Sequence, residues 1–210
     1  MNFLPVKIPR IFNTIIPNRT WHIDTKEKVL YLTFDDGPTP LITDWVLDCL
    51  KTFKAQATFF CIGKNVEAQP HIYQRILKEK HAVGNHTFNH LNGWTTNNLT
   101  YLNDIKLAEN HIESSLFRPP YGRIGKRQSK LILDANFKII MWSVLSKDYN
   151  NKVSRQECLN NVINNAENGS IIVFHDSKKA FKNMQYTLPI FLKIYSAKGF
   201  RFKRIPESIL

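Results

Sequence analysis

Hydrophobic positions follow two different rhythms along this chain. Short runs in which nearly every residue is apolar or β-branched, such as VLYLTF at residues 29–34, are typical of strands buried on both faces. Other segments carry apolar residues three or four positions apart, which is the spacing of one helix face. The predicted strands are 29–34, 57–62, 82–85, 116–118, 138–144, 170–175 and 200–204.

The helical spacing fills the intervals between these runs. In residues 43–53, for example, apolar side chains recur at steps of one and three. The predicted helices are 43–53, 70–80, 98–114, 126–135, 154–165 and 183–197. Strands that alternate with helices predict parallel β-α units in an α/β fold. No polar linker divides the chain, so we expect one domain over residues 28–210 after a lead-in segment, residues 1–27.

Two architectures fit this alternation, a compact β/α barrel and an open, doubly wound sheet. Barrel enzymes carry their chemistry at the carboxyl ends of several strands, whereas an open sheet concentrates it at one switch point. Polar residues with catalytic potential follow five of the seven predicted strands: Asp35 and Asp36, His86 and His90, Arg118, Asp148, and His175 with Asp176. This distribution favours the barrel.

Composition and charge further narrow the class of protein and its possible partners. The chain has 210 residues, 43% hydrophobic and 22% charged, which excludes a disordered polymer. Its formal charge is 29 − 17 = +12, and residues 106–210 hold 18 basic against 8 acidic groups. Such a basic half is compatible with a nucleic acid, an anionic polymer, a membrane surface or solubility alone. No apolar run approaches ~18 residues, so no transmembrane helix is expected.

Cysteines and the N-terminus add little chemistry. Cys49, Cys61 and Cys158 are odd in number and widely spaced, which argues against a disulfide scaffold and a thiolate zinc site. Prolines and basic residues interrupt the first twelve positions, MNFLPVKIPRIF, so no secretory signal is recognisable there. We therefore expect a cytoplasmic protein or one whose location the sequence leaves open.

Two clusters of candidate residues could hold a metal ion. Asp35 and Asp36 precede a Gly-Pro turn, which lets the backbone leave strand geometry; a solvated Asp-Gly turn is the alternative. His86 and His90 are spaced to share one face of a helical turn, although two ordinary histidines would look the same. Two histidines and one aspartate form an open catalytic metal site.

Two further clusters suggest acyl-transfer chemistry. In residues 118–122 (RPPYG), two prolines stiffen the loop, so the backbone amides from Tyr121 onward are held still, as an oxyanion donor requires. The alternative is a structural turn. His175 ends an apolar run and could act as a general acid, or it could be a hydrogen-bonded core histidine.

Together these segments resemble the polysaccharide deacetylase family, also called the NodB-homology domain or the family 4 carbohydrate esterases. The resemblance covers residues 28–205 and its motifs come in the family's order. They are TFDDGP at 33–38, ATFF at 57–60 with GKN at 63–65, HTFNH at 86–90, RPPYG at 118–122 and GSIIVFHD at 169–176. The resemblance implies a distorted (β/α)7 barrel in a single domain.

The resemblance also implies an activity and a cofactor. The expected reaction is removal of acetyl groups from N-acetylated sugars of a polysaccharide or oligosaccharide. The cofactor is a divalent metal, usually Zn²⁺, with Co²⁺ or another divalent ion possible. By position, the ligands are Asp36, His86 and His90.

The remaining roles are carried over in the same way. Asp35 corresponds to the general base, and Arg118 orients it. The Tyr121 amide corresponds to the oxyanion donor. His175 corresponds to the general acid, and Asp148 tunes its pKa.

The chain departs from the family pattern at three positions. Leu145 replaces an aspartate and Tyr149 a tryptophan in the motif that contains Asp148, and Val173 stands where a leucine is usual. These changes alter the wall expected beside the acyl group. The alternatives are therefore a related hydrolase acting on another amide or an O-acetyl ester, and a non-catalytic carbohydrate-binding homologue.

The basic residues suggest what kind of carbohydrate is bound. They cluster at 123–130, 178–182 and 193–204, and the first two clusters follow site motifs. We therefore expect them near the mouth of the site, where they could attract an anionic glycan. No nucleic-acid-binding motif accompanies the charge. The sequence leaves the sugar polymer and the oligomeric state open.

Overall fold

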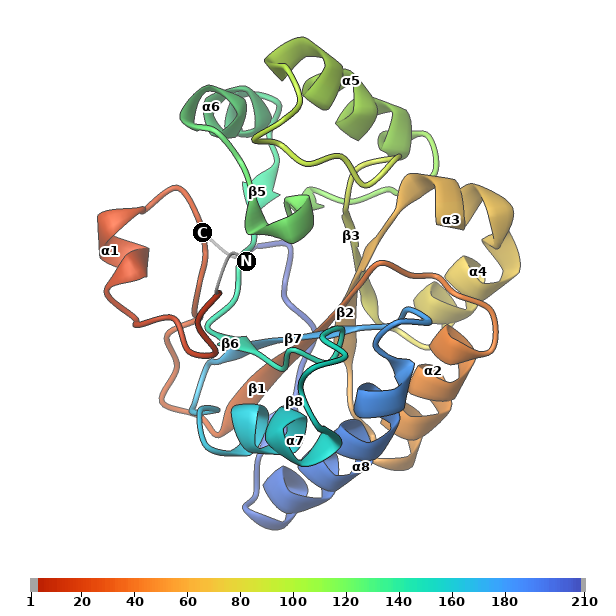
Figure 1. Ribbon diagram of the computed structural model, residues 1–210, viewed down its shortest axis with the longest axis vertical. Helices are drawn as coiled ribbons and strands as arrows, with labels where there is room; N and C mark the ends of the chain where they lie inside the picture. The colour runs from red at the N-terminus through yellow and green to blue at the C-terminus, as the bar shows by residue number, and fades with distance from the viewer. Residues whose placement is uncertain (1–3, 209–210) are drawn as a thin grey trace.

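A curled parallel sheet forms the centre of the molecule, seen in a computed structural model that describes residues 4–208 (Figure 1). The strand order is β5-β4-β3-β2-β1-β7-β6, and β8 pairs with β1 outside this path. The strands are β1 (Val29–Asp35), β2 (Ala57–Cys61), β3 (Ala82–Asn85), β4 (Leu116–Phe117), β5 (Lys138–Ile139), β6 (Val144–Leu145), β7 (Ile171–His175) and β8 (Arg201–Phe202). The expected distorted (β/α)7 barrel is confirmed.

Helices surround the curled sheet on its outer side (Figure 1). They are α1 (Phe12–Ile15), α2 (Ile42–Thr52), α3 (Gly63–Ala68), α4 (Pro70–Lys78), α5 (Asn98–Glu109), α6 (Lys126–Asp134), α7 (Arg155–Ile163) and α8 (Phe181–Ala197), with a short 3-10 turn η1 (Pro120–Gly122). All six predicted helices are present. Helix α3 was not predicted because its six residues contain only one large apolar side chain, Val66, and so show no periodicity.

One predicted strand is wrong. Residues 138–144 were expected to form a single strand, but the chain forms β5 and β6 with a break between them. Hydrogen bonds to a side chain explain the break, because the carbonyl oxygens of Ile140 and Met141 accept from the Arg118 guanidinium. The continuous apolar run of this segment therefore reflects burial rather than unbroken strand pairing.

Two layers of apolar side chains hold the sheet in place. On one face of β1, Phe34 stacks between Phe59 of β2 and Phe174 of β7, with ring centroids 5.0 and 5.9 Å apart. This layer belongs to a cluster that also contains the inner faces of α2 and α8. Side chains on the opposite face of the sheet, including Phe60 of β2 and Val173 of β7, pack inside its curl. All seven β1 residues are buried, as its continuous apolar run predicted.

The N-terminal segment fills the space between the two edge strands. Among the described residues, β5 and β6 form no ladder with each other, and residues 7–20 lie across the gap. Lys7 bridges Val144, and Thr20 bridges Ile140. Trp21 packs edge-on against Trp142. The boundary at residue 27 stays a prediction, and residues 1–3 and 209–210 lie outside the described part.

The topology brings the candidate residues together. Strands β1, β3, β4 and β7 are parallel, so their carboxyl ends share one rim of the curled sheet. Asp35 and His175 lie side by side as register partners on β1 and β7. In the part of the chain that the structure describes, no helix is long and apolar enough to cross a membrane.

Candidate active site

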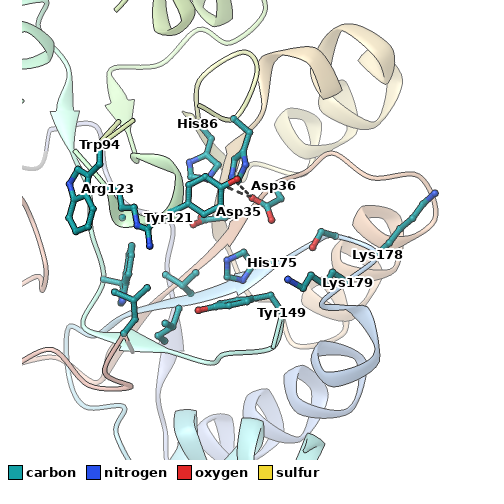
Figure 2. A pocket seen from close by; sticks show the side chains of 17 residues that line it. Asp35, Asp36, His86, Trp94, Tyr121, Arg123, Tyr149, His175, Lys178 and Lys179 are labelled. Carbon is teal, nitrogen blue, oxygen red and sulfur yellow. Dashed lines mark ion pairs between the residues drawn. The ribbon is translucent and has the colours of Figure 1, made fainter. Parts of the chain in front are cut away.

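Three predicted metal ligands converge at this rim. The ligand atoms of Asp36, His86 and His90 all lie within 4.8 Å of one another. Asp36 Oδ1 is 3.2 Å from His90 Nε2 and 3.7 Å from His86 Nε2. Figure 2 shows the Asp36 carboxylate pointing at the imidazoles from the loop after β1. One oxygen and two nitrogen donors are a set typical of catalytic zinc sites.

The environment of His86 prepares its ring for metal binding. His86 is 2% exposed, and its Nδ1 lies 2.7 Å from the Arg118 carbonyl oxygen. That acceptor requires Nδ1 to carry the proton, which leaves the Nε2 lone pair facing Asp36. Burial lowers the pKa of His86 to about 4, so the ring is neutral at pH 7. A neutral imidazole with a free Nε2 is the form that coordinates metals.

Asp36 is held in its ionised form. Burial opposes its charge, but the hydrogen bond from His90 and the positive charge of His175 outweigh burial. The pKa of Asp36 therefore lies well below its usual value. Its backbone has φ 79°, a left-handed conformation that turns its side chain away from the strand direction.

The predicted helical turn at the two histidines is absent. Residues 86–90 form an irregular loop with left-handed backbone at Thr87 and His90. Asp104, on α5, accepts hydrogen bonds from the backbone N–H groups of Phe88 and Asn89 at 2.9 Å each. These N–H groups are thus bonded to a carboxylate instead of to helical carbonyls. The histidines converge through this fixed loop rather than through helical spacing.

Asp35 is paired with an arginine inside the curl of the sheet. Arg118 Nη1 donates to Asp35 Oδ1 at 2.7 Å and to Thr33 Oγ1 at 2.6 Å. The guanidinium is completely buried and lies 4.1 Å over the Phe60 ring. Burial lowers the pKa of Arg118, and the neighbouring carboxylate of Asp35 opposes that shift. Arg118 therefore fixes the position of the Asp35 carboxylate.

His175 and Asp148 form a second pair across the pocket. His175 Nδ1 lies 2.8 Å from Asp148 Oδ1, and the other oxygen, Oδ2, accepts the His175 backbone N–H. Burial alone would lower the pKa of His175, but fully buried Asp148, with Asp36 and Asp35, raises it to about 9. At neutral pH the imidazole holds a proton beside the predicted ligand triad of Asp36, His86 and His90.

Tyr121 lies on the same rim, and the role expected of it concerns its backbone N–H rather than its phenol. The side chain is 52% exposed, and its ring packs 4.6 Å from the His90 ring. The residue has φ 60° between Pro120 and Gly122. The stiff loop predicted from the double proline therefore lies next to His90, a predicted metal ligand.

Most of the predicted site residues line one cavity of about 830 Å³, whereas Arg118 and Asp148 lie behind its wall. Asp35, Asp36, His86, His90 and His175 all reach it. Its walls also include the three positions at which the chain departs from the family pattern: Leu145, Tyr149 and Val173. The Tyr149 ring packs edge-on against His175 at 4.8 Å. Basic side chains from two of the predicted clusters line its edge: Arg123, Lys178 and Lys179.

Several residues that shape the site were not predicted. Asp104 is buried on α5 together with the apolar residues Tyr101, Ile105 and Ala108, and a carboxylate on that helix face was the available signal. Asn65 donates from Nδ2 to the Asp36 carbonyl oxygen at 2.7 Å, steadying the ligand loop. Trp94 lines the pocket from the loop before α5, and no spacing in the sequence indicated it.

Comparison with known proteins places this geometry in a family. The polysaccharide deacetylase model matches residues 22–140. A peptidoglycan-N-acetylglucosamine deacetylase of Bacillus cereus is 36% identical over 197 residues, covering 90% of this chain and 92% of that protein. A chitooligosaccharide deacetylase of Azorhizobium caulinodans is 33% identical over 162 residues, covering 73% of this chain and 76% of that protein.

A solved structure extends the likeness to three dimensions. The crystal structure of a peptidoglycan N-acetylglucosamine deacetylase superposes with a TM-score of 0.87 at 32% identity, covering 95% of each chain. A match of this extent covers nearly the whole chain. The chain therefore belongs to the polysaccharide deacetylase family.

Proposed function

We propose that this chain is a metal-dependent hydrolase that removes acetyl groups from N-acetylated sugars of a glycan. The observation that carries the proposal is the placement of a proton-holding His175–Asp148 pair and an arginine-bound carboxylate, Asp35, on the same cavity as the triad. A non-catalytic carbohydrate-binding protein would need neither the proton-holding pair, nor the arginine-bound carboxylate, nor the triad. Their joint presence favours catalysis.

The triad fits a divalent metal. Asp36, His86 and His90 would hold it, and Zn²⁺ suits two imidazoles and one carboxylate, with Co²⁺ as an alternative. When bound, a divalent metal polarises an acyl oxygen and lowers the pKa of water. The three ligands leave room for substrate and water, as catalytic sites require.

Asp35 is suited to accept a proton from the attacking water. Its Oδ1 accepts from Arg118, and the carboxylate lines the cavity, where its second oxygen can act on a bound water. Arg118 is a positioning residue, because it binds Asp35 and does not itself line the cavity. A base held in a fixed orientation contributes ~10²–10⁴-fold to such a reaction.

His175 is suited to protonate the leaving amine. Breaking an amide C–N bond leaves a poorly stabilised nitrogen anion unless a proton arrives, and protonated His175 can supply it. Tyr121 contributes its backbone N–H to the acyl oxygen as negative charge builds there. The products are acetate and a free amino sugar, so the atoms of one water are divided between them.

We propose further that the natural glycan is anionic and of the peptidoglycan type. Two relatives are named for peptidoglycan N-acetylglucosamine and N-acetylmuramic acid, which supports this choice over a neutral chito-oligosaccharide. Arg123, Lys178 and Lys179 place positive charge around the cavity. A positive rim raises the local concentration of an anionic polymer.

Acetate release tests the activity directly. The metal-loaded chain is incubated with peptidoglycan fragments, chito-oligosaccharides, small N-acetyl sugars and O-acetylated xylan, and acetate is quantified. We expect release from N-acetylated glycans, fastest from peptidoglycan fragments. Release from xylan alone would replace the proposal with an O-acetyl esterase, and no release from any substrate would favour the non-catalytic homologue.

Metal analysis tests the site independently. The purified wild type should hold one equivalent of divalent metal, and His86→Ala should hold none. His111→Ala is the matched control, because His111 faces Glu67 away from the cavity and should not change metal content. Unchanged metal in His86→Ala would contradict the ligand assignment.

A further inference from the structure

An exposed tryptophan borders the cavity beside the proposed metal site. Among the described residues, Trp94 is 64% exposed, and it lines the same cavity as the triad. The other large exposed apolar side chain on this cavity is Tyr121. A flat aromatic surface left in water at the rim of a binding cavity is a site for a ligand with an apolar face.

An arginine accompanies Trp94. The Arg123 guanidinium lies 5.1 Å over the Trp94 ring centroid and reaches the cavity. Within residues 4–208, Arg123 forms no ion pair with a carboxylate. Stacking on the ring orients the guanidinium while leaving its N–H groups available, and such a planar fork suits a carboxylate.

The loops that carry these two residues are fastened to each other. Gln128, 3% exposed, donates from Nε2 to the carbonyl oxygens of Gly93 and Thr96 at 2.8 and 3.0 Å. Its Oε1 accepts the Gly125 N–H at 2.9 Å. A Cβ on Gly93 would lie only 2.5 Å from the Arg123 carbonyl oxygen, so the loops pack too closely for any larger residue. The Trp94–Arg123 pair is therefore preformed.

The pair lies to one side of the proposed reacting centre. Figure 2 shows Trp94 and Arg123 at one end of the cavity, beyond Tyr121, with Asp36 and His175 nearer the middle and Lys178 and Lys179 at the other end. A sugar on Trp94 is thus a neighbour of the sugar whose acetyl group is removed. This arrangement requires a ligand longer than one monosaccharide.

We propose that Trp94 and Arg123 form a subsite for the sugar next to the one deacetylated, and that this sugar carries a carboxylate. Trp94 stacks on the apolar face of the sugar ring, and Arg123 pairs with the carboxylate. The subsite rests on the proposed deacetylase function and makes it specific: a neutral neighbour uses the stacking surface alone, whereas a carboxylated neighbour uses both residues.

The test compares three glycans with the metal-loaded enzyme. Chitotetraose is neutral, peptide-free peptidoglycan strands carry the carboxylate of the sugar's lactyl group, and strands with stem peptides carry peptide carboxylates. We expect Arg123→Gln to lower kcat/KM about fivefold on a carboxylated glycan, the size of one partly exposed ion pair, and to leave chitotetraose unchanged. The strands without peptides show whether the lactyl carboxylate alone supplies the charge or whether a peptide carboxylate is required.

Trp94→Ala and a matched control complete the design. Trp94→Ala should raise KM about tenfold on all three glycans with kcat unchanged, since stacking acts on binding. Arg127→Gln removes an exposed charge that does not line the cavity, and it should change neither constant on any of the three glycans. Activity on chitotetraose also reports whether each variant is folded.

The outcomes separate the two proposals. Equal loss on neutral and carboxylated glycans in Arg123→Gln, or no loss on either, would overturn the subsite while the deacetylase function stands. An unchanged KM in Trp94→Ala would overturn the stacking role. Failure of the wild type to release acetate from all three glycans would overturn the function itself, and the subsite with it.

Discussion

The two buried ion pairs beside the cavity differ in the kind of cation that each contains. On one side Asp35 is paired with Arg118, whose charge is permanent and whose guanidinium is wholly buried under backbone carbonyls and Phe60. On the other side Asp148 is paired with His175, which titrates and faces the cavity. A permanent cation fixes an orientation, whereas a titratable one can deliver a proton. The difference supports the proposed roles, with the base on the first side and the acid on the second.

Removing the reacting group from each side should have the largest effect, and the two sides should differ in stability. Asp35→Asn and His175→Gln should each lower acetate release by ~10²–10⁴-fold. Asp35→Asn also leaves the buried Arg118 without its counter-charge, whereas the side-chain amide introduced by His175→Gln keeps an N–H for Asp148. His175→Gln also removes the charge paired with buried Asp148, so we expect both variants to lose free energy of unfolding and Asp35→Asn to lose more, measured by urea denaturation. Equal stability in the two variants would contradict the comparison.

Removing the permanent cation should destabilise the fold strongly. Arg118→Met leaves Asp35 and the carbonyl oxygens of Ile140 and Met141 without their donor, and breaking such a pair costs ~3–5 kcal/mol. Arg123→Met is the matched control, because Arg123 is partly exposed and pairs with no carboxylate of the described residues; it should cost under ~0.5 kcal/mol. Denaturant unfolding measures both variants. Similar losses would show that the burial of Arg118 adds nothing.

The difference between the two sides also marks what the sequence could predict. Asp35 and His175 end long apolar runs, so their place at strand ends followed from local pattern alone. Their partners came from the family resemblance, because Arg118 is 83 residues from Asp35 and Asp148 is 27 residues from His175. Contacts this distant leave no periodic signal in one sequence.

Loop conformation could not be predicted for a related reason. The His86–His90 loop was expected to be helical, but Asp104 binds its backbone N–H groups from a helix 15 and 16 residues away. The break between β5 and β6 arises in the same manner, from the Arg118 side chain just after β4. In both places a distant polar side chain overrides the local pattern. The strands, held by local burial, were predicted more closely.

The titratable pair should set the alkaline limit of activity. The acid form of His175 exists below its pKa, which Asp148 raises above the usual 6.5, so wild-type kcat should fall on the alkaline side of neutral pH. Asp148→Asn removes the charge that raises this pKa, so the alkaline limb should move to lower pH by about one unit or more. Initial rates of acetate release across roughly pH 6–10 measure the shift. An unchanged alkaline limb would show that Asp148 does not raise the pKa of the general acid.

The free energy of unfolding should depend on pH through the same pair, and it should also fall as pH rises. The pKa of His175 is raised from its usual 6.5, so its pairing stabilises the fold fully below pH 6.5, and this stabilisation is lost as pH rises through about 9. Asp148→Asn should therefore flatten the pH dependence of unfolding in that window. Asp134→Asn, which removes an exposed carboxylate paired with Lys130, should leave both pH profiles unchanged.

The smallest effect should come from the wall beside the acid. Val173 lines the cavity on β7, two residues before His175, where the family usually has the longer leucine. Val173→Leu adds one methylene to this wall, so it should lower the kcat/KM ratio of N-propionyl to N-acetyl glycan by about tenfold, the lower end of what one methylene contributes in a tight pocket. Val83→Leu makes the same change on β3, outside this cavity, and controls for overpacking. Because the ratio cancels any loss of folded enzyme, an unchanged value in Val173→Leu would show that Val173 does not limit the acyl group.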